Sequence, residues 1–125
     1  MILDASAVLA LLQDEPGAET VRAHLPDAAI VSVNLEEVVG ILVREGMTAS
    51  AVDQVVSALA LPVLPFVESM AWMAGRLRAR LPAGLGVADR CCLAAAAVTG
   101  RPVATADALW TDAGRVFDVE VVMIR

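Results

Sequence analysis

The segment M-I-L-D-A-S-A-V-L-A-L-L-Q (residues 1–13) joins a short apolar run, one acidic residue and a second apolar stretch. Met1–Leu3 predicts a buried strand, and Ala5–Gln13 predicts a helix with Ser6 near its cap. The sequence D-E-P-G that follows breaks the helical pattern. Asp4 therefore lies between two apolar elements, where an acid is either a helix cap or a functional group.

The alternation of strands and helices continues along the chain. Further strands are predicted at Ala29–Val33, Leu61–Phe66, Pro102–Thr105 and Val119–Ile124. Helices are predicted at Ala18–His24, from Asn34 to Gly46, at Thr48–Leu59, Glu68–Leu81 and Val87–Thr99, with a short helical piece near Leu109. Asn34 is expected to cap its helix, with Glu37 at the third position of a capping-box pattern. This order predicts a single α/β domain over residues 1–125, a three-layer α/β/α sandwich around a mainly parallel sheet.

Three further acids occur in the same setting as Asp4, close to the end of an apolar run or the start of a helix. Glu37 lies in S-V-N-L-E-E-V, Asp89 in L-G-V-A-D-R and Asp107 in T-A-D. The carboxyl ends of parallel strands meet at one edge of a sheet, where α/β proteins bind ligands. Acids gathered there need a counter-cation, and carboxylate oxygens suit Mg²⁺ or Mn²⁺. Asp112, one turn beyond Asp107, is a candidate auxiliary ligand.

Each of these acids also has a purely structural interpretation. Asp4 and Asp107 are placed to cap helices, and Asp89 in a first helical turn gains up to about 1 kcal/mol from the helix dipole. Asp89 nevertheless shares a helix face with apolar neighbours such as Cys92, where a charge needs a partner or a cation. Glu36 and Glu37 are consecutive, so only one can point at the site, and position alone leaves that choice open.

The charged residues exclude several classes of enzyme. The chain has 15 acidic and nine basic residues, a formal net charge of −6, and every basic residue is arginine. Without lysine there is no Walker A loop, no Schiff base and no receiver-type lysine, which counts against an aspartyl phosphoacceptor domain. The single histidine, His24, is far along the chain from every acidic candidate, which argues against a histidine-dependent triad.

The hydropathy of the chain is high, with 58% hydrophobic residues and a mean hydropathy of +0.71. The longest clean apolar run, Cys91–Val98, is well short of the roughly 18–20 residues of a membrane span. We therefore expect no membrane association and a partner that covers part of the apolar surface. No signal peptide is visible, which favours a cytoplasmic protein, and the adjacent Cys91 and Cys92 read as reduced helix residues.

Arginines and tryptophans supply the remaining candidates for nucleic-acid contact. Arg76, Arg78 and Arg80, with Arg90 nearby, form the only basic cluster. Solvated helix charges that pair with acids are the simpler interpretation, and a phosphate-contacting patch is the alternative. Trp72 and Trp110 are expected in core or edge packing, with base stacking as the alternative.

Taken in order, the four acidic segments resemble the motifs of PIN-domain ribonucleases. The segments are D-A-S-A-V-L-A-L-L at Asp4, S-V-N-L-E-E-V at Glu37, L-G-V-A-D-R-C-C-L-A at Asp89 and T-A-D-A-L-W at Asp107. The set is most similar to the small VapC-type toxins of bacterial toxin–antitoxin modules. The resemblance selects Glu37 over Glu36, because the glutamate of the family motif precedes a hydrophobic residue. It also puts Ser6 and Thr105 at small hydroxyl positions beside the site.

The resemblance implies a metal-dependent endoribonuclease in which Asp4, Glu37, Asp89 and Asp107 bind Mg²⁺ or Mn²⁺. Such ions generate a nucleophile from water and stabilise the leaving 3′-oxygen of RNA. The resemblance further implies a homodimer and a cognate antitoxin that covers an apolar groove and blocks the site. A non-catalytic PIN-like module that acts only through its antitoxin complex is the alternative within the family.

Overall fold

Five short strands form one parallel sheet in a computed structural model that describes all residues 1–125. The strands are β1 (Ile2–Leu3), β2 (Ala29–Val31), β3 (Val63–Leu64), β4 (Val103–Thr105) and β5 (Val121–Met123). Their order in the sheet is β3-β2-β1-β4-β5, and every neighbouring pair is parallel. Because β1 is central, the residue that follows it, Asp4, lies at the middle of the carboxyl edge.

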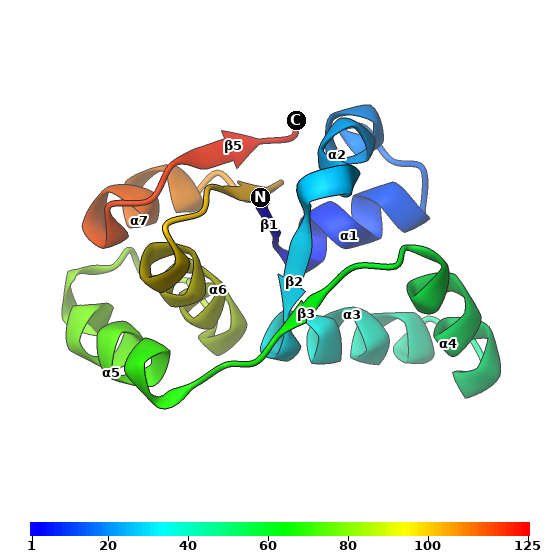
Figure 1. Cartoon of the computed structure of the whole chain (residues 1–125), viewed down its shortest axis with the longest axis horizontal. Coiled ribbons are helices and arrows are strands. Elements are labelled where there is room, and N and C mark those ends of the chain that lie inside the picture. The colour runs from blue at the N-terminus through cyan, green and yellow to red at the C-terminus, as the bar shows by residue number, and fades with distance from the viewer.

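Helices cover both faces of this sheet. They are α1 (Ala5–Leu12), α2 (Ala18–His24), α3 (Ser32–Arg44), α4 (Ala49–Ala58), α5 (Glu68–Leu77), α6 (Val87–Thr99) and α7 (Trp110–Phe117), with 3₁₀ turns η1 (Leu25–Asp27) and η2 (Arg78–Arg80). Helices α1 to α4 lie on one side of the sheet and α5 to α7 on the other (Figure 1). The predicted three-layer α/β/α sandwich and its element order are confirmed.

Successive strand residues supply two separate cores. Ile2 packs into a cluster with Leu93 and Trp110, beneath α5 to α7, whereas Leu3 packs with Val8 and Val38 on the opposite face. A strand whose side chains alternate between two apolar layers needs apolar residues throughout. This requirement explains why the strand sequences are continuous hydrophobic runs and why strands of only two or three residues suffice.

The start of α3 differs from its prediction. The helix begins at Ser32, so β2 ends at Val31 instead of Val33, and Asn34 belongs to the first helical turn. Asn34 is not the helix cap, because its buried side chain donates a hydrogen bond to Asp4. The Ser32 hydroxyl likewise turns to the neighbouring strand connection and accepts the Phe66 N–H at 3.2 Å.

Other predicted boundaries were too generous. Strand β3 covers Val63–Leu64 and not Leu61–Phe66, because Pro62 and Pro65 have no N–H to donate to a ladder. The predicted helix Glu68–Leu81 divides into α5 and the 3₁₀ turn η2. Trp110 is fully buried as predicted, but Trp72 is 59% exposed and does not belong to the core.

Several local predictions are confirmed in detail. Helices α2 and α6 have the predicted bounds, and the Thr48 hydroxyl caps α4 by accepting the Ala51 N–H at 3.2 Å. Gly100 ends α6 in the left-handed conformation that favours glycine. Cys91 and Cys92 are buried free thiols in α6. None of the helices combines the length and the apolar character needed to cross a bilayer.

Two glycines of similar local structure should respond oppositely to alanine. A Cβ at Gly114 in α7 would lie 2.4 Å from Val121 Cγ2, whereas a Cβ at Gly75 in α5 would meet nothing within 4 Å. Gly114→Ala should lower the free energy of unfolding by about 1–3 kcal/mol through overpacking. Gly75→Ala should raise it by about 0.5–1 kcal/mol through helix propensity. Urea unfolding followed by circular dichroism measures both, and equal effects would contradict the packing of α7 on β5.

Candidate metal centre

Asp4 is the buried centre of a hydrogen-bond network at the carboxyl edge of the sheet. Only 3% of the residue is exposed. Its Oδ2 accepts from the Ser6 hydroxyl at 2.7 Å, the Thr105 hydroxyl at 3.0 Å and the Ser6 N–H at 3.3 Å. Its Oδ1 accepts from Asn34 Nδ2 at 3.2 Å. Asp4 is therefore both the cap of α1 and a group held in one orientation by two strands and two helices.

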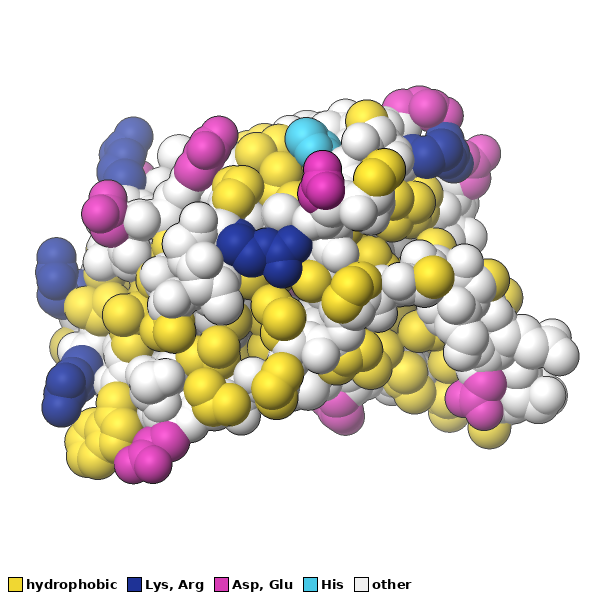
Figure 2. All heavy atoms as spheres, in the orientation of Figure 1, with side chains coloured by type: hydrophobic (Ala, Val, Ile, Leu, Met, Phe, Trp, Pro, Cys, Tyr) yellow, Lys and Arg dark blue, Asp and Glu magenta, His cyan; other side chains and the backbone are white.

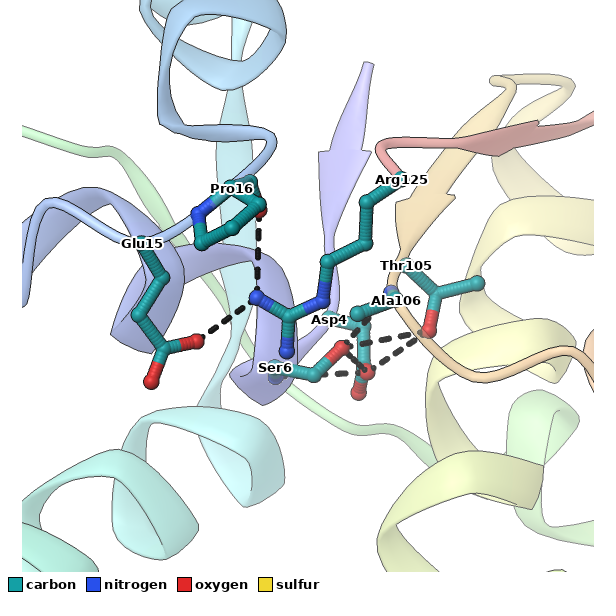
Figure 3. Close-up of polar contacts among 7 residues, drawn as sticks. All are labelled: Asp4, Ser6, Glu15, Pro16, Thr105, Ala106 and Arg125. Carbon is teal, nitrogen blue, oxygen red and sulfur yellow. Dashed lines mark hydrogen bonds and ion pairs between the residues drawn. The ribbon is translucent and has the colours of Figure 1, made fainter.

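Ser6 and Thr105 extend this network into the segment that carries Asp107. The Ser6 Oγ accepts the Ala106 N–H at 2.9 Å, and the Thr105 Oγ1 accepts the Asp107 N–H at 3.1 Å. Figure 3 shows both hydroxyls directed at the Asp4 carboxylate. Figure 3 also draws a separate contact, in which Arg125 Nη1 donates to Glu15 Oε2 at 2.7 Å and to the Pro16 carbonyl at 3.1 Å. The end of β4 and the start of α1 are thus locked together around Asp4.

Glu37 reaches the same place from α3. The residue is half-buried, and its Oε2 is enclosed without any hydrogen-bond donor. Glu36, the alternative, is exposed to solvent. Burial raises the pKa of Glu37, and the charges of Asp4, Asp89 and Glu36 raise it further. Glu37 is therefore the member of the pair that faces the other acids.

Asp89 arrives from the first turn of α6. Its Oδ2 accepts the Gly86 N–H at 2.6 Å, so one carboxylate oxygen stabilises the start of α6. This contact is the structural role that the sequence also allowed for Asp89. Burial raises the pKa of Asp89, the Gly86 hydrogen bond opposes that rise, and the charges of Asp4 and Asp107 add to it. Burial raises the pKa of the Cys92 thiol, and the charges of Asp4, Asp89 and Glu37 raise it further, so Asp89 and Cys92 share the inward face as expected.

Asp107 and Asp112 occupy different surroundings. Asp107 is partly exposed, follows β4 and uses Oδ1 to accept the Leu109 N–H at 2.9 Å. Its charge acts on Asp89, which joins it to the cluster. Asp112 is exposed on α7, where its Oδ1 pairs with Arg115 Nη1 at 3.1 Å. The structure thus brings together Asp4, Glu37, Asp89 and Asp107 and leaves Asp112 in a surface ion pair.

The charges of these four acids oppose one another: Asp4 and Asp89 act on Glu37, and Asp4 and Asp107 act on Asp89. For Asp4, burial raises the pKa, and the hydrogen bonds from Ser6 and Thr105 only oppose the rise. The pKa values of Asp4, Glu37 and Asp89 are therefore all raised. Such a shift means that the folded protein disfavours the charged forms that neutral pH imposes.

The donor set fits a hard divalent cation. No three acids, histidines or cysteines lie close enough together to surround one ion as they stand. The buried Glu37 Oε2 and Asn34 Oδ1, however, have no hydrogen-bond partner. A cation drawn between the carboxylates would pair with the Glu37 oxygen and cancel the repulsion. Binding one ion would therefore require these carboxylates to lie closer together than they do in this structure.

Asn34 is the residue whose role the sequence pattern did not indicate. Its amide donates to Asp4 and, at 3.5 Å, to the Ala88 carbonyl of α6, so it joins α3 to the acid cluster and to the neighbouring helix. The available signal was its spacing: Asn34 lies three residues before Glu37 and four before the buried Val38, on the inward face of α3. Because asparagine is common at helix caps, the sequence pattern favoured a capping role for Asn34 instead.

The sequence model of the PIN domain matches residues 1–116. The chain belongs to the PIN-domain family. Among curated proteins, none is similar enough to count as a match. The family assignment agrees with the resemblance of the four acidic segments, which was drawn from their order alone.

Solved structures of toxin–antitoxin proteins share this fold. VapBC2 from Rickettsia felis, bound to a promoter DNA fragment, has a TM-score of 0.76 at 14% identity, covering 98% of this chain and 96% of that one. VapBC from Salmonella typhimurium, bound to DNA, has a TM-score of 0.74 at 20% identity, covering 99% and 97%. VapBC-5 from Mycobacterium tuberculosis has a TM-score of 0.67 at 26% identity, covering 98% and 96%. The PIN domain here therefore spans nearly the whole length of those chains.

The unpaired Glu37 should make metal-free protein less stable at neutral pH than at mildly acidic pH. A carboxyl whose pKa is raised on folding loses stability as pH rises from its ordinary value of 4.5 toward the raised value. Glu37→Gln should therefore raise the free energy of unfolding at pH 7 by up to about 1 kcal/mol, reduced by solvent screening. The gain should shrink as pH falls toward 4.5.

Glu36→Gln is the matched control, because Glu36 is exposed on the adjacent helix position. Urea unfolding in EDTA at pH 7 and near pH 5 measures both variants against the parent. Equal gains for the two variants, or a Glu37→Gln gain that grows at low pH, would contradict the placement of Glu37 in the cluster.

Proposed function

We propose that this PIN domain is an endoribonuclease that hydrolyses RNA with Mg²⁺ or Mn²⁺ held by Asp4, Glu37, Asp89 and Asp107. One observation carries the proposal: the enclosed Glu37 Oε2 has no donor, and the charges of Asp4 and Asp89 add to the rise that burial causes in the pKa of Glu37. A divalent ion resolves that arrangement, and PIN domains generally use one. PIN-domain toxins are also generally nucleases, which supports hydrolysis as the reaction.

Each residue would contribute in its own way. Asp4 would orient the ion, because Ser6, Thr105 and Asn34 fix its carboxylate. Glu37 and Asp89 would complete the charge balance from α3 and α6, and Asp107 would do so from the end of β4. The bound ion would act as a Lewis acid on the phosphate and would lower the pKa of a water nucleophile. No histidine or lysine is needed, in agreement with a chain that has one histidine and no lysine.

The biological role that we propose is that of a VapC-type toxin, active in the cytoplasm as a homodimer and neutralised by a cognate antitoxin. The solved neighbours include toxin–antitoxin complexes, which supports this assignment. An apolar hollow of about 220 Å³ among α1, α3, α4 and β3 is a candidate seat for an antitoxin segment. Eight of its nine lining residues are hydrophobic, among them Val8, Leu35 and Val56.

Cleavage of RNA by the purified protein is the direct test. We expect Mg²⁺ or Mn²⁺ to support cleavage that leaves a 5′-phosphate and a 3′-hydroxyl, and EDTA to abolish it. Asp4→Asn and Asp89→Asn should each lower the rate at least about 100-fold, because each removes a charge from the ion site. Gel electrophoresis of labelled RNA with end-group analysis provides the measurement.

Asp53→Asn is the control for these variants, because Asp53 is exposed on α4. Asp112→Asn decides the role of the auxiliary candidate: near-parental activity is expected from its surface ion pair with Arg115. Activity that survives both EDTA and Asp4→Asn would refute the mechanism. A protein that binds its antitoxin but cleaves no RNA would instead be the non-catalytic module.

Metal binding is testable without catalysis. Saturating Mn²⁺ at 100 times its dissociation constant should stabilise the folded protein by about 2.7 kcal/mol. Glu37→Gln should lose most of that gain, although it is more stable than the parent in EDTA, whereas Glu36→Gln should keep it. Differential scanning calorimetry at pH 7 with and without Mn²⁺ measures the shift. A gain that is the same in Glu37→Gln and the parent would place the ion elsewhere.

A further inference from the structure

Four arginines on one side of this acidic protein have no acidic partner. The ion pairs of the chain involve Arg22, Arg115 and Arg125. No ion pair is made by the members of the cluster that the sequence singled out, Arg76, Arg78, Arg80 and Arg90. Arg76, Arg78 and Arg80 are exposed, as predicted for solvated helix charges, but the predicted pairing with acids is wrong for all four. Figure 2 shows basic side chains along the edge of the molecule where α5 lies.

Two of these arginines share a polar hollow. Arg78 and Arg90 both line a cavity of about 220 Å³ between η2, the loop that follows it and the start of α6. The same two side chains line a second cavity of about 200 Å³ against Val87 and Cys91. The pair thus stands between two neighbouring hollows and contributes charge to both. Arg76 differs, because its guanidinium lies over the Trp72 ring, 5.1 Å from the ring centroid.

Arg90 is held in place while most of its donors remain free. Its Nη1 donates to the Leu85 carbonyl at 2.8 Å, which is the only hydrogen bond of its side chain. A guanidinium has five N–H donors, so the remaining ones can bind a ligand. Arg78 makes no side-chain hydrogen bond and is exposed. One anchored and one free guanidinium suit an anion with several oxygens, because two planar forks can engage it from different directions.

The arginine pair adjoins the carboxylate cluster. Arg90 follows Asp89 directly, and its charge offsets part of the rise that burial causes in the pKa of that carboxyl and of the Cys91 thiol. The loop that lines the hollow also touches the Asp107 segment, because a Cβ at Gly84 would lie 3.2 Å from Leu109 Cδ1. A chain molecule that reached the acids could therefore continue across Arg78 and Arg90.

We infer that Arg78 and Arg90 form a binding subsite for an RNA backbone phosphate next to the scissile one. The inference rests on the proposed ribonuclease function and adds the path of the substrate. The acids with their cation would take the reacting phosphate, and the arginines would neutralise a neighbour, which an acidic protein otherwise repels. Planar guanidinium groups match phosphate oxygens in a way that isolated ammonium charges do not.

Equilibrium binding of single-stranded RNA separates this subsite from catalysis. The probe is a fluorescein-labelled oligoribonucleotide, and the background is Asp4→Asn in Mg²⁺ so that cleavage does not intervene. Arg78→Gln and Arg90→Gln should each weaken binding about tenfold, the effect of one charged hydrogen-bond contact. Each should also lower the slope of log K against log salt by about 0.7, the value for one phosphate on a single strand.

Arg44→Gln is the matched control, because Arg44 is an exposed arginine without an ion pair at the last residue of α3, away from α5 (Figure 1). It removes the same charge and should change neither affinity nor slope appreciably. Equal losses in Arg44→Gln and Arg78→Gln would overturn the subsite in favour of net charge alone. Unchanged RNA binding by Arg78→Gln would also overturn the subsite. The Arg78 side chain makes no hydrogen bond, so this substitution should leave the fold intact, and urea unfolding checks that it does.

The two proposals fail in different ways. If the parent cleaves RNA and the arginine variants bind RNA as it does, the subsite is refuted and the ribonuclease stands. If the parent cleaves no RNA but the variants lose binding and slope, Arg78 and Arg90 bind an RNA phosphate, but the nuclease is refuted and with it the place of that phosphate beside a scissile one. Loss of antitoxin affinity with unchanged RNA binding would assign the arginines to an acidic segment of a protein partner, and would overturn the inference.

Discussion

A buried carboxylate at the end of the central strand constrains the rest of this domain. Asp4 is nearly inaccessible, and its two oxygens accept hydrogen bonds from α1, α3 and β4. An ionised group so placed is costly unless every lone pair is occupied and its charge is balanced. Three hydrogen bonds reach Oδ2 and one reaches Oδ1, so the first condition is met in part, and none of these neutral donors balances the charge. Ser6, Asn34 and Thr105 must therefore keep their positions around Asp4. Their hydrogen bonds fix α1, α3 and the end of β4 relative to one another.

The sheet topology explains why the other acids gather around this point. Strand β1 lies between β2 and β4, so the connections that leave all three strands begin at the same edge. Glu37 is carried there by α3, which starts directly after β2, and Asp107 by the turn after β4. Asp89 comes from α6, which packs against α3. The cluster is a consequence of parallel order, and its unbalanced charge is left for a cation to neutralise.

The element order could be predicted from the sequence because it depends on local signals, whereas the choice of Glu37 over Glu36 came from the family resemblance and not from position. Apolar runs, caps and breakers fixed where strands alternate with helices, and α6 matched its predicted bounds. The orientation of Asn34 was not predictable in that way. Its capping propensity and its hydrogen bond to Asp4 compete for one side chain, and only the packed structure decides between them. The exposure of Trp72 likewise depends on how α5 rests on the sheet, which periodicity does not determine.

The distribution of charge decides how an acidic protein can bind a polyanion. At physiological ionic strength, exposed charges more than about 8 Å apart are largely screened, so local arrangement outweighs a net charge of −6. Acids paired with Arg22, Arg115 and Arg125 leave those arginines little capacity for a phosphate. Arg78 and Arg90 remain free to bind a phosphate, and they lie beside the carboxylate cluster that needs a cation. A substrate phosphate would then meet positive charge from the ion and from these arginines, although most of the surface repels it.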